Sequence, residues 1–205
     1  MIVTGIEEMS RSRSRVYLDG SFAFVLYKGE LRFYGIRTGE ALEEEAFLTI
    51  TEELLPKRAT LRCMNLLKSR PYTEKQLRDK LAQGLYPQES IDLALDYVKS
   101  YHYVDDDRYA RDYIENQQEK KSKRVIETDL LRKGIPKELV ESAFREQQDA
   151  GIGPDEDALA KMWLEKKHFD PQNADYKERQ KMSAFLYRKG IGTAAIRRAL
   201  SLDWE

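Results

Sequence analysis

The apolar residues from Ala59 onward recur every three or four positions, which is the spacing of amphipathic helices. Within this region a pair of large apolar residues four positions apart occurs three times. The pairs are Leu77 with Leu81, Ile126 with Leu130, and Met182 with Leu186. This spacing predicts three copies of one helical unit.

The positions that follow each pair support the same repeat. Ten residues after each pair comes a further branched residue, and an alanine with a large apolar neighbour follows three residues later. These positions are Ile91, Ala94 and Leu95; Val140, Ala143 and Phe144; and Ile196, Ala199 and Leu200. A second pattern, small-x-x-large-large, precedes each pair, at residues 63–67, 110–114 and 160–164. Each unit therefore reads as three helices, with the small-x-x-large-large pattern on the first.

Helix-end signals divide each unit further. Thr73 and Gln76 form a capping-box sequence at the start of the second helix. Ser122 occupies the matching position in the second unit, whereas the third unit has Glu178 there and so lacks the cap residue. We expect the second helices to end near glycines that tolerate a left-handed φ. These glycines are Gly84, Gly134 and Gly190; Pro87 and Pro136 then begin the third helices, and Gly192 takes that place in the third unit.

A β-hairpin is predicted before the repeats. Residues 15–18 and 21–26 have strand character, and Asp19-Gly20 between them suits a two-residue turn. The pairing that follows sets Leu18 opposite Ser21, Tyr17 opposite Phe22, and Val16 opposite Ala23. It also predicts two apolar faces, one with Tyr17, Phe22, Phe24 and Leu26, and one with Val16, Leu18, Ala23 and Val25. Residues 2–9 are a candidate third strand.

The domain boundaries follow from these patterns. Short helices are expected at 30–34 and 43–55, and Pro56 is expected to close the N-terminal segment. The predicted domains are 1–58 (hairpin and short helices), 59–104, 105–150 and 151–205 (three-helix repeats). The fold class is mainly α. Because stacked units bury continuous faces, we expect an elongated, curved array, whose long surface suits binding to a long partner.

Composition excludes several classes of protein. The 205 residues carry 35 Lys and Arg against 36 Asp and Glu, so the net charge of −1 argues against binding to nucleic acid by overall charge alone. No stretch reaches the roughly 18 apolar residues of a membrane span, and the first 20 residues lack the apolar core of a secretory signal. We therefore expect a cytoplasmic protein with no membrane contact.

Candidate catalytic groups are scarce. The lone cysteine, Cys63, falls within a helical pattern and reads as a small core residue, and neither His102 nor His168 has partners at metal-ligand spacing. The acidic run at 105–107 reads as a helix N-terminus, where carboxylates favour the helix dipole. No glycine-rich phosphate loop or serine-nucleophile motif occurs. We expect no enzyme activity, no catalytic residues, no metal and no cofactor.

Three separated segments carry a family resemblance. They are Arg70-Pro71-Tyr72-Thr73-Glu74-Lys75-Gln76-Leu77, then Tyr103-Val104-Asp105-Asp106-x-Arg108-Tyr109-Ala110, then Leu130-Leu131-x-Lys133-Gly134-Ile135. In this order they resemble the motifs of the RecX family, the regulators of the RecA recombinase. The helical resemblance covers 59–200, and the hairpin resembles an N-terminal extension found in many members.

The resemblance implies a regulator that binds the RecA filament on single-stranded DNA. Such a protein would lie in the filament groove and restrain filament extension, ATP hydrolysis, strand exchange and the coprotease role in the SOS damage response. It implies no cofactor. We expect a monomer, with direct DNA contact open through local basic clusters. The alternative is a helix-turn-helix-like DNA-binding protein that acts without a recombinase; a tetratricopeptide array is disfavoured because the repeat period is near 50 residues rather than about 34.

Two basic clusters are the candidate contact sites for the filament or for nucleic acid. The first comprises Arg11, Arg13 and Arg15, which alternate before or within a strand and so share a face. The second comprises Lys120, Lys121, Lys123 and Arg124, at a loop and the start of a second helix. Solvated charge is the competing interpretation for both. Tyr109, Tyr113 and Trp163 are expected in repeat cores, and Lys133 and Lys189 are expected as charges at helix C-termini.

Overall fold

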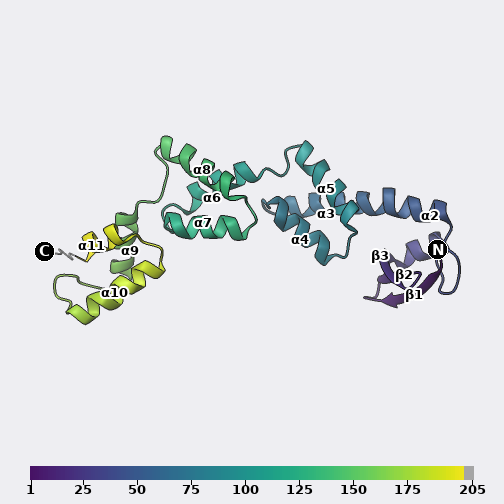
Figure 1. Ribbon diagram of the computed structural model, residues 1–205, viewed down its shortest axis with the longest axis horizontal. Helices are drawn as coiled ribbons and strands as arrows, with labels where there is room; N and C mark the ends of the chain where they lie inside the picture. Colours follow the sequence, from purple (N-terminus) through teal and green to yellow (C-terminus); the bar gives the residue numbers. More distant parts are fainter. Residues whose placement is uncertain (201–205) are drawn as a thin grey trace. The chain divides into compact units, whose positions relative to one another are not determined.

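The computed structural model describes residues 1–200 and divides into two compact units, Met1–Asp105 and a second that begins at Asp106. The predicted end of the third repeat, 201–205, lies outside the described residues. Each unit is described by itself. The N-terminal unit holds a three-stranded sheet and six helical segments, and the second holds six helices, grouped in threes (Figure 1).

The N-terminal sheet is antiparallel, in the order β1 (Val3–Glu8), β2 (Arg13–Leu18) and β3 (Ser21–Tyr27). The predicted hairpin and third strand are therefore confirmed. Leu18 pairs with Ser21 and Tyr17 with Phe22, as expected.

The remainder of the predicted hairpin register is wrong. Val16 pairs with Phe24 instead of Ala23, because the ladder shifts by one residue between Val16 and Tyr17. Ala23 is the extra residue of a β-bulge. The shift places Phe24 and Leu26 on the buried face with Val16 and Leu18, and leaves Tyr17 and Phe22 edge to face at 6.0 Å on the other. One well-filled core face replaces the two mixed faces that a regular ladder would give.

A continuous helical run links the sheet to the first repeat. It consists of α2 (Glu44–Leu48), the π-helical segment η1 (Thr49–Leu54) and α3 (Leu55–Leu67). Pro56 does not close the segment as expected; it lies in the first turn of α3, where the change from π to α winding already disturbs the hydrogen-bond ladder. The short helix α1 (Lys28–Phe33) precedes this run.

Arg58 on α3 fastens the sheet to the helical run. Its guanidinium donates to the carbonyl oxygen of Val25 at 3.1 Å, forms an ion pair with Glu30 of α1, and lies 4.8 Å from the ring centre of Tyr27. Only 16% of the Arg58 side chain is exposed. One partly buried cation therefore joins β3, α1 and α3.

Each repeat has its own hydrophobic core, as the sequence spacing predicts. The first repeat is α3, α4 (Glu74–Gln83) and α5 (Gln88–Ser100); the second is α6 (Asp106–Gln117), α7 (Lys123–Arg132) and α8 (Lys137–Asp149); the third is α9 (Glu156–Lys166), α10 (Tyr176–Arg188) and α11 (Thr193–Ala199). The first and third helices of each repeat pack most extensively. The small residues Cys63, Ala110 and Ala160 are fully buried, each in a different core.

The helix ends confirm some predictions and correct others. Thr73 and Gln76 form the predicted capping box. Ser122 occupies the N-cap of α7, but its hydroxyl makes no cap hydrogen bond. In the third repeat the N-cap is Asp175 and not Glu178, and these two residues form a capping box that the sequence pattern did not predict.

The left-handed residue after the second helix varies among the repeats. Gly134 and Gly190 have φ of 89° and 84°, as expected for helix-terminating glycines. In the first repeat, however, Gly84 has an ordinary φ of −78°, and Leu85 takes the left-handed position with φ of 60°.

The second and third repeats meet at Gly190. The Ser122 hydroxyl donates to the carbonyl oxygen of Lys189 at 3.2 Å, and a Cβ placed on Gly190 would lie 2.2 Å from that hydroxyl oxygen and 2.9 Å from a methyl carbon of Val125. Since both neighbours belong to the start of α7, they leave no room for a side chain at residue 190.

Gly190→Ala is expected to lower the free energy of unfolding more than Gly151→Ala. Both glycines have positive φ, so alanine carries the αL penalty of about 1 kcal/mol at either site, but nothing lies within 4 Å of a Cβ at Gly151. Urea unfolding of the two variants isolates the clash with Ser122. Equal losses of stability would show that the α7–α10 junction does not constrain residue 190.

Candidate interaction surfaces

The predicted cluster at 120–124 surrounds the start of α7, and its members have different surroundings. Lys120 and Lys123 are exposed; the Lys123 ammonium lies 3.9 Å from a Glu127 carboxylate oxygen and 5.1 Å from the ring centre of Phe144. These are loose surface contacts that a partner could replace. Lys120 and Lys123 are therefore the members best placed to meet an acidic partner.

Lys121 turns toward the protein. Its ammonium donates to the carboxylate of Asp129 at 2.8 Å and to the hydroxyl oxygen of Tyr113 at 2.9 Å, and the Tyr113 hydroxyl donates to the same carboxylate at 3.0 Å. Burial raises the pKa of Asp129, but the bonds from Lys121 and Tyr113 outweigh it, so the pKa lies below the ordinary 3.8. Lys121 thus stabilises the second repeat.

Arg124 joins two repeats. Its guanidinium donates to the backbone carbonyl oxygen of Tyr187 at 2.5 Å and lies 4.6 Å from the centre of the Tyr187 ring. Together with the Ser122 bond, this contact fixes the start of α7 against the end of α10. Arg124 is still exposed, so it keeps its positive charge at the surface.

The arginines of the N-terminal cluster are also divided. Arg15 forms a 3.1 Å ion pair with Glu7 of β1. The hydrogen bonds from Arg15 and from the Tyr17 hydroxyl hold the pKa of the Glu7 carboxyl below its ordinary value. Arg13 lines a small crevice beside Tyr27 and Arg58. Arg11 lies exposed in the turn between β1 and β2.

The aromatic residues of the first helices pack at the repeat cores and also contact lysines. Tyr109 and Tyr113 stack at 6.2 Å and are partly buried, as is Trp163. Lys133 and Lys189 are the C-caps of α7 and α10, as expected for charges at helix C-termini. Each ammonium also lies over an aromatic ring, Lys133 5.2 Å from Tyr113 and Lys189 4.4 Å from Trp163.

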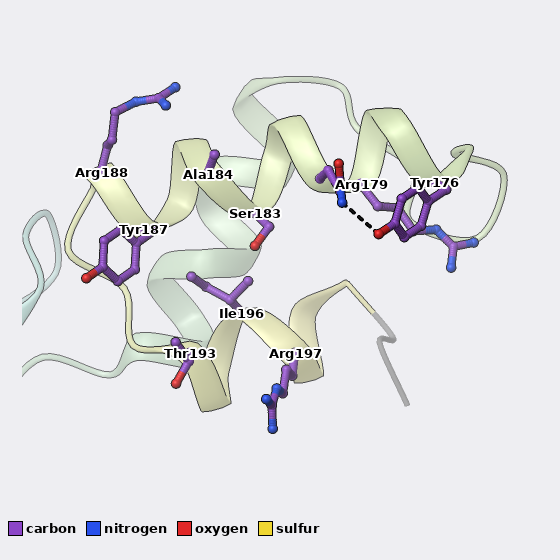
Figure 2. A pocket seen from close by; sticks show the side chains of 10 residues that line it. Tyr176, Arg179, Ser183, Ala184, Tyr187, Arg188, Thr193, Ile196 and Arg197 are labelled. Atoms are coloured by element: carbon purple, nitrogen blue, oxygen red, sulfur yellow. Dashed lines mark hydrogen bonds between the residues drawn. The ribbon is translucent and has the colours of Figure 1, made fainter. Parts of the chain in front are cut away.

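The motifs did not predict a groove that lies between α10 and α11. It encloses about 700 Å³. Its lining is Tyr176, Arg179, Gln180, Ser183, Ala184, Tyr187, Arg188, Thr193, Ile196 and Arg197. Figure 2 shows Ser183 and Ile196 facing the space between the two helices, with Tyr187 at one end and Tyr176 and Arg179 at the other. The spacing of these residues is the same as in any amphipathic helix, so the sequence does not predict a groove.

The described residues contain neither a reactive thiol nor a metal site nor a membrane-spanning helix. Cys63 is buried, and burial raises the pKa of its thiol to about 11, so it is protonated at neutral pH. Among residues 1–200 no group of three or more His, Cys, Asp or Glu side chains could hold a metal ion. Over the same residues, none of the helices combines the length and apolar character needed to cross a membrane.

Family models match the three repeats in order. The models describe the first, second and third three-helix domains of RecX, and match residues 59–97, 105–143 and 155–200. Among relatives, the regulatory protein RecX of Caldanaerobacter subterraneus subsp. tengcongensis is 30% identical and aligns over 98% of this chain and all of its own length. The regulatory protein RecX of Clostridioides difficile is 27% identical over 98% of this chain and 94% of its own.

Solved structures share the fold. A crystal structure of regulatory protein RecX superposes with a TM-score of 0.61 at 20% identity, covering 98% of this chain and 99% of the other. RecX from Lactobacillus salivarius gives a TM-score of 0.57 at 19% identity, over 73% of this chain and 98% of its own. At these identities the likeness supports the architecture.

Asp129→Asn is expected to destabilise the protein by about 1 kcal/mol at pH 7, because it removes a charge-assisted, partly exposed hydrogen-bonded pair. The carboxyl has a folded pKa below its unfolded value, so its contribution is present above about pH 4 and is lost as pH falls through the folded pKa. The wild type and the variant should therefore converge in stability as pH falls below 3.8.

Urea unfolding at pH 7 and pH 3 measures this effect, with Asp149→Asn as the control. Asp149 is exposed at the end of α8. A difference between wild type and Asp129→Asn that is the same at both pH values would contradict a stabilising role for the ionised carboxylate.

Proposed function

This chain belongs to the RecX family, the regulators of RecA, and from that premise we propose that it binds the RecA filament on single-stranded DNA and restrains it. The restrained activities are filament extension, ATP hydrolysis, strand exchange and the coprotease function. The observation that carries the proposal is the ordered match of all three three-helix domains. We place this activity in the cytoplasm and assign it to a monomer.

The proposed contact sites are the exposed members of the two basic clusters. These members are Lys120, Lys123, Arg124 and Arg11, and their charges are available to carboxylates or phosphates. Lys121 and Arg15 have carboxylate partners within the protein, so their contribution to a partner surface is smaller. Direct contact with DNA through the exposed members is part of the proposal.

The alternative, a helix-turn-helix-like DNA reader, receives less support from the charges of the third helices. Asp92 of α5 pairs with Arg78 at 2.5 Å, and Glu146 of α8 pairs with Arg111 at 3.0 Å, so these two carboxylates hold other helices of their own repeat. Carboxylates at such positions would repel phosphate. In α11, Arg198 is held by Asp157 through two bonds of 3.0 and 2.9 Å.

The purified protein is expected to lower the ATPase rate of a cognate RecA filament on single-stranded DNA at substoichiometric or near-stoichiometric amounts. The physical reason is that a bound regulator blocks extension of the filament that hydrolyses ATP. A coupled assay of ADP release measures the rate, with short duplex DNA and no RecA as a parallel binding assay. An unchanged rate with both proteins folded would reject the proposal, and tight duplex binding would favour the alternative.

Lys120→Ser with Lys123→Ser is expected to weaken binding to the filament and to flatten its salt dependence, because fewer counterions are released on binding. The matched control is Arg132→Ser with Lys137→Ser, which removes the same charge from the second repeat at side chains that are 75% and 73% exposed. Fluorescence anisotropy across a salt series measures both pairs. Equal slopes for the two double variants would assign residues 120 and 123 to solvated surface.

A further inference from the structure

We propose that three lysines of the third repeat, Lys166, Lys167 and Lys189, form a contact site for single-stranded nucleic acid. The site lies outside both basic clusters predicted from the sequence. Its ligand is the nucleic acid itself, so the inference does not depend on binding to RecA. Measurements on the purified chain without RecA therefore test it separately from the proposed function.

The three ammonium groups gather around two aromatic rings that contact each other. The rings of Trp163 and Phe185 meet edge to face, with their centres 5.7 Å apart. The Trp163 ring centre lies 4.4 Å from the Lys189 ammonium and 5.0 Å from that of Lys166. The Phe185 ring centre lies 5.2 Å from the Lys167 ammonium and 5.5 Å from that of Lys189. The ends of α9 and α10 thus bring three positive charges together.

These charges are not neutralised within the part of the chain that the structure describes. Among residues 1–200, none of the ion pairs includes Lys166, Lys167 or Lys189. An aromatic ring attracts an ammonium group through its quadrupole but carries no net charge, so the site stays positive. Lys166 and Lys167 are exposed, and Lys189 is partly buried. An anion from outside can therefore reach the cluster.

The second repeat has a related arrangement that includes its own anion. Tyr113 occupies the position of Trp163, and the Lys121 ammonium lies 5.3 Å from its ring centre. The carboxylate of Asp129 accepts a bond of 2.8 Å from the same lysine. In the third repeat Phe185 stands at the position of Asp129, so a ring replaces the carboxylate. The third repeat thus keeps lysines over aromatic rings without the anion at this position.

Nucleic acid fits this combination of groups better than an acidic protein does. The faces of aromatic rings carry partial negative charge, which disfavours a carboxylate lying on them. Nucleobases, in contrast, stack on aromatic side chains, and Trp163 and Phe185 are both partly exposed. Lysine ammonium groups act as point charges that suit phosphate, whereas the planar fork that pairs with carboxylates belongs to arginine. Lysines beside exposed ring surface therefore match the backbone and bases of a single strand.

The ring contacts also restrict the lysines before a ligand binds. A lysine side chain loses rotamer freedom when it is fixed on an anion, and this loss opposes binding. Packing against Trp163 and Phe185 removes part of that freedom in advance. We therefore expect these three lysines to contribute more to binding than exposed lysines elsewhere in the same repeat.

The test is a titration of the full chain with an oligothymidylate of twelve nucleotides, followed by the fluorescence of Trp163. The Trp204→Phe variant is the background, because it leaves Trp163 as the only tryptophan. Lys166→Gln, Lys167→Gln and Lys189→Gln together should weaken binding by about tenfold or more at low salt. The triple variant should also lower the slope of log K against log salt by about two, since each phosphate contact with a single strand contributes about 0.7.

Lys161→Gln, Lys177→Gln and Lys181→Gln together are the matched control. They remove the same charge from exposed positions of the same repeat, and the described residues give these lysines no cation–π contact. Circular dichroism checks that both triple variants are folded. A loss of binding as large in the control would overturn the proposal by showing a diffuse charge effect. Binding that leaves the emission of Trp163 unchanged, or no binding at low salt, would overturn it too.

Two further arms examine other occupants. A peptide of twelve glutamates that binds more tightly than oligothymidylate, and loses binding in the first triple variant, would replace the proposal by an acidic protein partner; weaker binding of this peptide supports it. The chain also has carboxylates in Asp203 and Glu205. If oligothymidylate binds only after Asp203→Asn with Glu205→Gln, the lysines belong to these carboxylates and the proposal fails; similar binding before and after supports it.

Discussion

The fold depends on one steric constraint, the small residue buried in the first helix of each repeat. Cys63, Ala110 and Ala160 are each fully buried, and in each repeat the first helix packs most extensively on the third. A small side chain lets two helices approach closely, and the surrounding large residues then fill the remaining space at high density. A larger residue at these positions would force the helices apart and open the cores that the second helices complete.

The same packing decides which charges remain available at the surface. At the start of α7, neighbouring basic residues have opposite roles, because Lys121 faces Asp129 and Tyr113 while Lys123 faces solvent. Arg124 serves both purposes, since it binds the backbone of α10 and remains exposed. A basic run in the sequence is therefore not one surface. The direction in which each side chain leaves the helix, and the position of the neighbouring repeat, decide which of these basic residues are structural and which are exposed.

The repeat could be predicted from sequence because its signal is periodic and recurs three times. The positions of Leu77, Ile126 and Leu186 in their cores follow from spacing alone. The bulge at Ala23 could not be predicted, because both registers satisfy the turn at Asp19-Gly20 and only burial of Phe24 and Leu26 separates them. Likewise, the groove between α10 and α11 depends on how two consecutive helices pack, and the Ser122 hydroxyl donates to a carbonyl oxygen of another repeat.

The separation of the hydrophobic cores has a consequence for how this chain loses its structure. The N-terminal sheet and the three repeats each bury a distinct cluster, in contrast to a single interior shared by all elements. Cooperativity is then strongest within a cluster and weaker between clusters, as in other repeat proteins. We therefore expect amide protons in different repeats to exchange through separate local openings, and the clusters to melt in steps that are only partly coupled.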